Sequence, residues 1–181
     1  MSITVAKSAG FCFGVNRAIN IVNSLLDKNV KVSTLGPIIH NMEVVNELES
    51  RGCKAVDNID EVEKDATLVI RSHGVPKYVI DKLDENGVKY EDATCPFVKK
   101  IHNIVANPDN KDGIVLIAGN SVHPEVEGII GHCSTECHTF KNSEEIDEIY
   151  NIVLKKNNKQ VFVVAPVSYT HLRAHETGAY L

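Results

Sequence analysis

The chain has 181 residues, of which 43% are hydrophobic and 24% are charged, and its formal net charge is −5 at neutral pH. At roughly 100–150 residues per domain, this length accommodates one large domain or two compact ones, and an acidic chain without a basic stripe gives no reason to expect nucleic-acid binding. No apolar run approaches the roughly 20 residues of a membrane helix and no apolar signal segment opens the chain, so we expect a cytoplasmic protein without a membrane partner.

Short apolar runs alternate with amphipathic stretches along the chain. The runs are rich in Val and Ile and predict buried strands over residues 3–6, 31–35, 67–70, 88–90, 113–118, 136–140 and 160–165. Between them, apolar residues at helical spacing predict helices over residues 15–26, 42–48, 76–83 and 144–150. This alternation indicates an α/β fold with parallel sheets covered by helices.

Cysteine and histidine side chains follow five of the predicted strands at their carboxyl ends. They are Cys12, His40, His73, Cys95 and His123. Taken singly, each would be interpreted as a core cysteine or a loop histidine. In open parallel sheets, however, ligands bind at the carboxyl edge, because the loops there are free of packing duties and helix amino termini point into the crevice. The five placements together therefore predict a shared site.

The five cysteines are an odd number in a chain without an export signal, which favours reduced thiols or metal ligands over disulfides. Cys133 and Cys137, with His132 and His138, offer the ligand types of a zinc site. Adjacent side chains in the predicted strand over residues 136–140 would point to opposite faces, so ordinary packing is the favoured interpretation there. Cys53, which follows a predicted turn, is also expected to be structural.

Five segments carry a resemblance to a known family. They are residues 9–15 (AGFCFGV), 36–41 (GPIIHN), 71–75 (RSHGV), 92–96 (DATCP) and 123–126 (HPEV). In order and spacing they resemble the 4-hydroxy-3-methylbut-2-enyl diphosphate reductases, over residues 1 to about 165. The resemblance implies three similar small α/β domains around a central [4Fe–4S] cluster, of which this chain holds two. Residues 1–13 would form an amino-terminal strand and the first cysteine loop, residues 14–94 the first domain, and residues 95–165 a truncated second domain.

The resemblance also implies roles for single residues. Cys12 and Cys95 match two of the three cluster ligands, and the third has no counterpart in this chain. His40, His73 and His123 match the diphosphate-binding histidines, since imidazoles donate hydrogen bonds to phosphate oxygens. Glu125 would supply a proton near the leaving oxygen.

The implied activity is reductive removal of the hydroxyl group of 4-hydroxy-3-methylbut-2-enyl diphosphate. The products would be isopentenyl and dimethylallyl diphosphate, the last step of the non-mevalonate isoprenoid pathway. An open iron of the cluster acts as a Lewis acid on the alcohol oxygen and supplies electrons, which arrive from a donor such as ferredoxin or flavodoxin. As a fragment, the chain itself is expected to be inactive.

The end of the chain departs from the family pattern. Pro166 interrupts the last predicted strand, and residues 167–177 (VSYTHLRAHET) resemble one translated reading frame of a common transposase sequencing adapter. We therefore expect residues 166–181 to be a non-native tail, and His171 and His175 are not counted as ligands despite their helical spacing.

Two other function classes remain open. The first is a phosphate-binding α/β module, although no Walker loop or dinucleotide glycine fingerprint follows a strand here. The second is a zinc-dependent hydrolase that uses the histidines and Glu125. A visible absorption spectrum after anaerobic iron–sulfide reconstitution separates both from an iron–sulfur enzyme.

Overall fold

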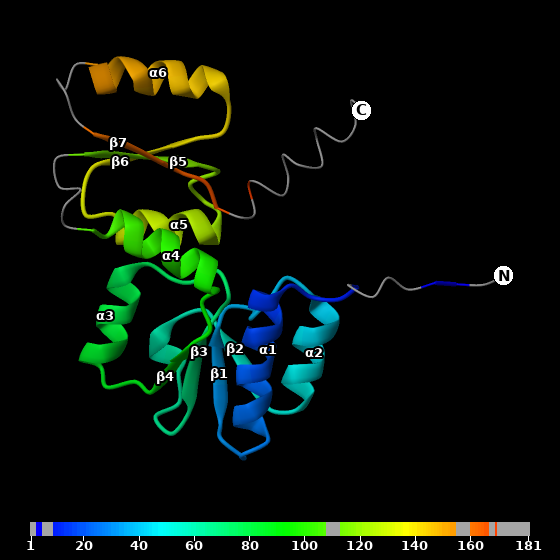
Figure 1. The fold of residues 1–181 in the computed structure, drawn as a ribbon. Helices are drawn as coiled ribbons and strands as arrows, with labels where there is room; N and C mark the ends of the chain where they lie inside the picture. Colours follow the sequence, from blue (N-terminus) through cyan, green and yellow to red (C-terminus); the bar gives the residue numbers. More distant parts are fainter. Residues whose placement is uncertain (1–2, 5–8, 108–112, 155–159, 167–168, 170–181) are drawn as a thin grey trace. The chain divides into compact units, whose positions relative to one another are not determined.

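The computed structural model describes residues 3–4, 9–107, 113–154, 160–166 and 169, and it contains two compact units (Figure 1). Unit 1 comprises Met1–Ser72 and Val88–Cys95, and unit 2 comprises His73–Gly87 and Pro96–Leu181. Each unit is built on one small, all-parallel sheet, as the alternation of strands and helices predicts. The expected domain boundaries and the three-domain arrangement stay predictions.

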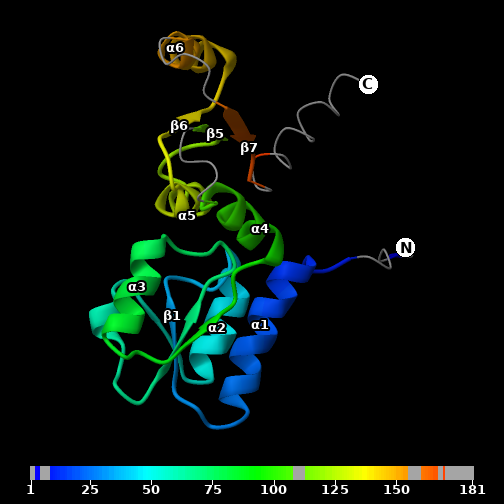
Figure 2. The ribbon, with the colours of Figure 1, turned by 60° about the vertical axis from the view of Figure 1, so that its left-hand side comes forward.

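The sheet of unit 1 has the strand order β2-β1-β3-β4. Its strands are β1 (Val32–Leu35), β2 (Cys53–Val56), β3 (Thr67–Ile70) and β4 (Tyr90–Asp92). Helices α1 (Phe13–Leu26) and α2 (Met42–Ser50) lie side by side, and a single 3-10 turn, η1 (Ile59–Glu61), follows β2 (Figures 1 and 2). Parallel strands need crossover connections, and α2 provides one between β1 and β2.

The core of unit 1 lies between these helices and the sheet. Ala18 and Val22 of α1, both 0% exposed, belong to one buried cluster with Val32, Leu48 and Val69. At roughly 1.5–3 kcal/mol for each fully buried aliphatic side chain, this apolar face is what holds α1 to the sheet.

Unit 2 places helices on both faces of a three-stranded sheet with the order β6-β5-β7 (Figure 1). Its strands are β5 (Ile114–Ala118), β6 (Cys137–Phe140) and β7 (Val161–Val164), and its helices are α3 (Lys77–Glu85), α4 (Pro96–Val105), α5 (Pro124–His132) and α6 (Ser143–Leu154). Helix α4 packs against α5, and α6 packs against β6. The core comprises Val105, Val115, Ile117, Val126, Ile129 and Val164.

The structure differs from the predicted elements in several places. Strand β2 is not among the predicted strands. It is a four-residue edge strand that pairs with one neighbour only and contains a lysine, so it shows no continuous apolar run. Helices α4 and α5 were also not predicted; each begins at a proline, a residue that favours the first helical position. Strand β4 lies at Tyr90–Asp92 rather than at residues 88–90.

The two ends of the chain are described only in part. Ile3 and Thr4 lie in neither helix nor strand, and residues 5–6 of the strand predicted there are outside the described residues. Of the predicted tail, Pro166 and Tyr169 are described, whereas His171 and His175 are not. Across the described residues, no helix combines the length and the apolar character needed to cross a membrane.

Candidate functional site

The loops at the carboxyl ends of β1, β3 and β4 lie together at one edge of the sheet of unit 1. The backbone amide of Cys95, after β4, donates to the carbonyl of Ser72, after β3, at 2.9 Å. A Cβ atom built on Gly36, after β1, would lie 3.2 Å from Nη1 of Arg71. These loops therefore lie close together within unit 1, and the shared site expected from them stays a prediction.

Of the two predicted cluster cysteines, Cys12 caps α1, and Cys95, in the loop between β4 and α4, packs against the first turn of α1. Cys12 is the exposed N-cap residue of α1, and its carbonyl accepts from the amide of Asn16 at 3.0 Å while its thiol makes no capping bond. Cys95 is half-buried, and its Sγ atom would lie 2.7 Å from a Cβ atom built on Gly14. The second thiol therefore packs against the first turn of the helix that the first cysteine caps.

Arg17, which no motif in the sequence marks, connects α1 to the loop that carries Cys95. Its guanidinium group donates to the carbonyls of Asp92 at 3.1 Å and Thr94 at 3.2 Å. The carboxylate of Asp92 accepts from the amide of Thr94 at 2.9 Å, which tightens the turn before Cys95. The one sequence feature that could have pointed to this contact was an arginine in the helix that follows Cys12.

His40 lies on the surface of unit 1, in the loop between β1 and α2. The two residues before it, Ile38 and Ile39, are 2% and 3% exposed and anchor the loop in the core. Asn41, directly after it, caps α2 by accepting from the amide of Val44 at 3.1 Å. The buried isoleucines before His40 and the helix cap after it therefore fix the backbone on both sides of this residue.

His73 and His123 lie close together in unit 2. Their ring centroids are 6.1 Å apart and the ring planes meet at 79°. His123 is the N-cap residue of α5, and its Nδ1 atom accepts from the amide of Glu125 at 3.2 Å. A neutral ring that accepts at Nδ1 carries its proton on Nε2, so in that form the second ring nitrogen of His123 is a hydrogen-bond donor.

Glu125 follows Pro124 in the first turn of α5, where the helix dipole favours an acidic side chain. It is 3% exposed, which is unusual for a glutamate. The amide of Glu125 connects this residue to His123, so unit 2 brings together His73, His123 and Glu125. Their roles in binding and catalysis, and those of the residues in unit 1, stay predictions.

The remaining cysteines differ from Cys12 and Cys95 in their surroundings. Cys53 is 6% exposed on β2, and burial raises the pKa of its thiol to about 11. Cys133 and Cys137 are half-buried and pack against the core of unit 2, where the thiol of Cys133 donates to the carbonyl of Ile129 at 3.4 Å. Among the described residues, no three His, Cys, Asp or Glu side chains form a group that could hold a metal ion. Cys12 and Cys95 carry thiols, the donor type that iron–sulfur clusters require, and their assignment as cluster ligands stays a prediction.

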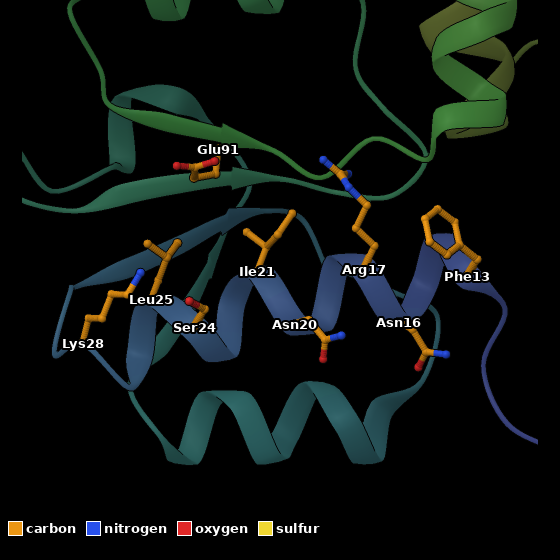
Figure 3. A pocket seen from close by; sticks show the side chains of 9 residues that line it. All are labelled: Phe13, Asn16, Arg17, Asn20, Ile21, Ser24, Leu25, Lys28 and Glu91. Atoms are coloured by element: carbon orange, nitrogen blue, oxygen red, sulfur yellow. The ribbon is translucent and has the colours of Figure 1, made fainter.

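A groove of about 480 Å³ follows the flank of α1 in unit 1 (Figure 3). Its lining includes Phe13, Arg17 and Lys28 of the α1 region and Glu91 of β4. None of the predicted site residues lines it. The groove lies beside the cysteine loops and is not the predicted site.

Comparison with known proteins identifies the family. The family model described as LytB protein matches residues 3–179, which extends into the predicted tail. The 4-hydroxy-3-methylbut-2-enyl diphosphate reductase of Clostridioides difficile (strain 630) is 40% identical over 150 residues, covering 82% of this chain and 54% of that protein. The protein of the same name from Alkaliphilus oremlandii (strain OhILAs) is 44% identical over 151 residues, with the same coverage. The chain spans about half the length of these relatives.

Solved structures give the same result. One described as (E)-4-hydroxy-3-methyl-but-2-enyl diphosphate reductase, the terminal enzyme of the non-mevalonate pathway, superposes with a TM-score of 0.72 at 32% identity, covering 90% of this chain and 66% of the other. The corresponding reductase from Plasmodium falciparum superposes with a TM-score of 0.76 at 27% identity, covering 94% of this chain and 54% of the other. The chain therefore belongs to the LytB protein family and is a homologue of the 4-hydroxy-3-methylbut-2-enyl diphosphate reductases.

Proposed function

We propose that the intact protein to which this chain belongs is a 4-hydroxy-3-methylbut-2-enyl diphosphate reductase. It converts the allylic alcohol diphosphate to isopentenyl and dimethylallyl diphosphate, in the last step of the non-mevalonate isoprenoid pathway. The observation that carries the proposal is the packing of the Cys95 thiol against Gly14, in the first turn of the helix that Cys12 caps. Relatives of that name at 40% and 44% identity support it.

Cys12 and Cys95 would hold a [4Fe–4S] cluster together with a third thiolate from sequence outside this chain. Soft thiolates are the ligands that iron–sulfur clusters require, and Cys12 is exposed while Cys95 is half-buried. When bound, such a cluster supplies electrons one at a time and an iron that polarises the alcohol oxygen. Arg17 and Gly14 keep the Cys95 loop against α1, so the chain itself positions one ligand relative to the other.

His40, His73 and His123 would bind the diphosphate group. The chain has a formal net charge of −5, so an anionic substrate needs local donors rather than a general positive field. His123 is preset for this role, because its Nδ1 atom accepts from the Glu125 amide and its Nε2 atom carries the proton. His73, 6.1 Å away by ring centroid, adds a second imidazole to the same face of unit 2.

Glu125 would deliver the proton that the departing hydroxyl group needs. Loss of the hydroxyl as water and formation of one C–H bond consume two electrons and two protons. The electrons come from a one-electron carrier such as ferredoxin or flavodoxin. Glu125 lies in the first turn of α5, and its backbone amide donates to Nδ1 of His123. Its carboxyl group can therefore act beside a diphosphate that the histidines bind.

The test uses the protein completed along its natural reading frame and reconstituted anaerobically with iron and sulfide. Cys12→Ser and Cys95→Ser should each abolish the cluster absorption and the turnover of the diphosphate substrate. The matched control is Cys53→Ala, which removes a buried thiol outside the proposed ligand set and should retain the cluster. Full cluster content in either serine variant would refute the assignment of that cysteine.

A second experiment compares residues 1–165 with the completed protein. With only two of the three proposed thiolates, the short form should bind no stable cluster and show no turnover. The completed protein should do both. If the short form holds a full, stable [4Fe–4S] cluster and turns over the substrate, the requirement for a further ligand is wrong.

A further inference from the structure

Helix α5 of unit 2 packs closely against the segment from His73 to Pro76. A Cβ atom built on Gly131 would lie 2.8 Å from the Cα atom of Pro76. One turn earlier in the helix, a Cβ atom built on Gly128 would lie 3.7 Å from the carbonyl oxygen of His73. Because the contact at Pro76 involves backbone, a larger residue at Gly131 would have to push the segment away from the helix.

The segment follows α5 from one end of the helix to the other. The ring of His73 lies beside that of His123, the N-cap residue of α5, with centroids 6.1 Å apart. Pro76 lies against Gly131, in the last turn of the same helix. The position of the segment along α5 therefore determines how closely His73 approaches His123.

His132, the last residue of α5, fastens this segment by a hydrogen bond. Its Nε2 atom lies 3.1 Å from the carbonyl oxygen of Val75. A carbonyl oxygen can only accept a hydrogen bond, so the imidazole donates in this contact. Val75 is 3% exposed, so water has little access to replace the donor.

A second histidine, His102 of α4, supports the ring of His132. The two rings are stacked, with centroids 4.1 Å apart and an interplanar angle of 20°. His102 is 5% exposed, and its Nε2 atom would lie 3.3 Å from a Cβ atom built on Gly128. His102 therefore fills the space over Gly128 and restricts rotation of the His132 ring, which keeps the donor directed at Val75.

We propose that His132 is a positioning residue for the diphosphate site of unit 2. By donating to Val75 it holds the segment that carries His73 on the glycine face of α5, and so sets the place of the His73 ring beside His123. His132 acts through His73 and not on the substrate. The inference rests on the proposed function, in which His73 and His123 bind the diphosphate group.

The proposal predicts a specific kinetic effect. The diphosphate group is unchanged by the reaction, so contacts with it stabilise the bound substrate and the transition state alike. Displacement of His73 should therefore raise KM and leave kcat nearly unchanged. A general loss of stability would instead reduce the amount of folded enzyme, which lowers the apparent kcat and leaves KM as it was.

Two substitutions of His132 in the completed protein separate the hydrogen bond from the ring stacking. His132→Phe keeps a ring that can stack on His102 but has no donor, so KM for the diphosphate substrate should rise about three- to tenfold. His132→Gln loses the ring, but its side-chain amide can donate to the Val75 carbonyl, so KM should stay within about twofold of the unsubstituted value. An unchanged KM in His132→Phe, or an equal rise in both variants, would overturn the proposal.

A second measurement does not depend on turnover. In NMR spectra of the 181-residue chain, the rings of His73 and His123 should show a nuclear Overhauser contact, with their signals assigned from His73→Gln and His123→Asn. The contact should persist in His132→Gln and weaken in His132→Phe. Equal ring contacts in the two variants would refute the positioning role. If the unsubstituted completed protein shows no turnover, the proposed function fails, and the ring contact alone then decides the role of His132.

Gly131→Ala tests the same packing from the side of the helix. In an open helix this change is favourable, but here the new methyl group meets the Cα atom of Pro76 and should displace the segment. Like His132→Phe, it should raise KM and weaken the ring contact, and it serves as the test if circular dichroism shows that His132→Phe is unfolded. Glu127→Ala, at an exposed position of α5, is the control and should change neither. A folded Gly131→Ala protein with unchanged KM and ring contact would contradict the proposal.

Discussion

The sulfur atom of Cys95 occupies the space where a side chain on Gly14 would begin, since a Cβ atom added there would lie 2.7 Å from it. Gly14 lies in the first turn of α1, separated from the cap residue Cys12 only by Phe13. Only a residue without a Cβ atom allows this approach. The close packing of a loop against a helix start thus brings two cysteines from distant parts of the sequence to one edge of unit 1.

Gly14→Ala should disturb this packing. In an ordinary helix, alanine is favoured over glycine by roughly 1 kcal/mol. Here the new methyl group would collide with Cys95 and should instead cost about 1–3 kcal/mol of unfolding free energy. Urea unfolding of the 181-residue chain measures the first effect, and cluster content of the completed protein measures the displacement of Cys95. Ser24→Ala, at an exposed position of the same helix, is the control, and a Gly14→Ala protein with unchanged stability and cluster content would contradict the prediction.

Arg17→Ala should destabilise unit 1 by about 1–3 kcal/mol, because the part-buried carbonyls of Asp92 and Thr94 lose a charged donor. The matched control is Arg51→Ala. Arg51 pairs at 2.6 Å with Asp27, whose side chain is 68% exposed, so its loss should cost no more than about 1 kcal/mol. Urea unfolding monitored by circular dichroism compares the two variants. Equal losses would show that Arg17 does not act through the Cys95 loop.

Two substitutions at His123 distinguish its capping role from its proposed binding role. Asparagine is a good N-cap residue, so His123→Asn should leave the stability of the chain nearly unchanged. Alanine cannot accept from the Glu125 amide, so His123→Ala should lose about 0.5–2 kcal/mol. Both variants lose the Nε2 donor, and in the completed protein each should raise KM for the diphosphate substrate by roughly tenfold or more. A KM that rises only in the alanine variant would assign His123 a structural role alone.

Glu125→Gln in the completed protein should retain the cluster and bind substrate yet lose most of its turnover. Glutamine preserves the shape of a side chain that is 3% exposed but cannot supply a proton. General acid–base catalysis contributes about 10²–10⁴ in rate, which sets the expected decrease in kcat. Glu127→Gln, on the exposed side of the same helix turn, is the control. Near-native kcat in Glu125→Gln would assign the proton to another group.

The pH dependence of alkylation should distinguish Cys137 from Cys53. Iodoacetamide reacts with thiolates, so the rate at Cys137 should rise with pH and reach half its maximum near pH 7, because its pKa is lowered to about 7. Cys53, with its pKa raised to about 11 by burial, should stay unmodified at pH 8 until the chain is unfolded in urea. Peptide mapping after timed labelling gives both rates. Equal labelling rates at Cys53 and Cys137 in the folded chain at pH 8 would contradict the prediction.

Local pattern was sufficient for the regular elements whose buried face repeats over several residues. The apolar spacing around Ala18 and Val22 predicted α1, and the β-branched run of β5 predicted a buried strand. Strand β2 could not be predicted in this way, because a short edge strand has no repeating buried face. The contacts of Arg17 could not be predicted for a different reason. Its partners are backbone carbonyls, which have no residue-specific signature in the sequence.

The sequence by itself determined the α/β class, the family and the identity of the candidate residues, because each rests on spacing along the chain. Tertiary structure alone decided that Cys95 packs on Gly14 and that His73 approaches His123. Ordinary packing was the expectation for Cys133 and Cys137, and both pack against the core of unit 2, although Cys133 caps α5 and lies outside the predicted strand. Contacts between separate elements depend on how those elements pack, and packing is a property of complementary surfaces that no single stretch of sequence contains.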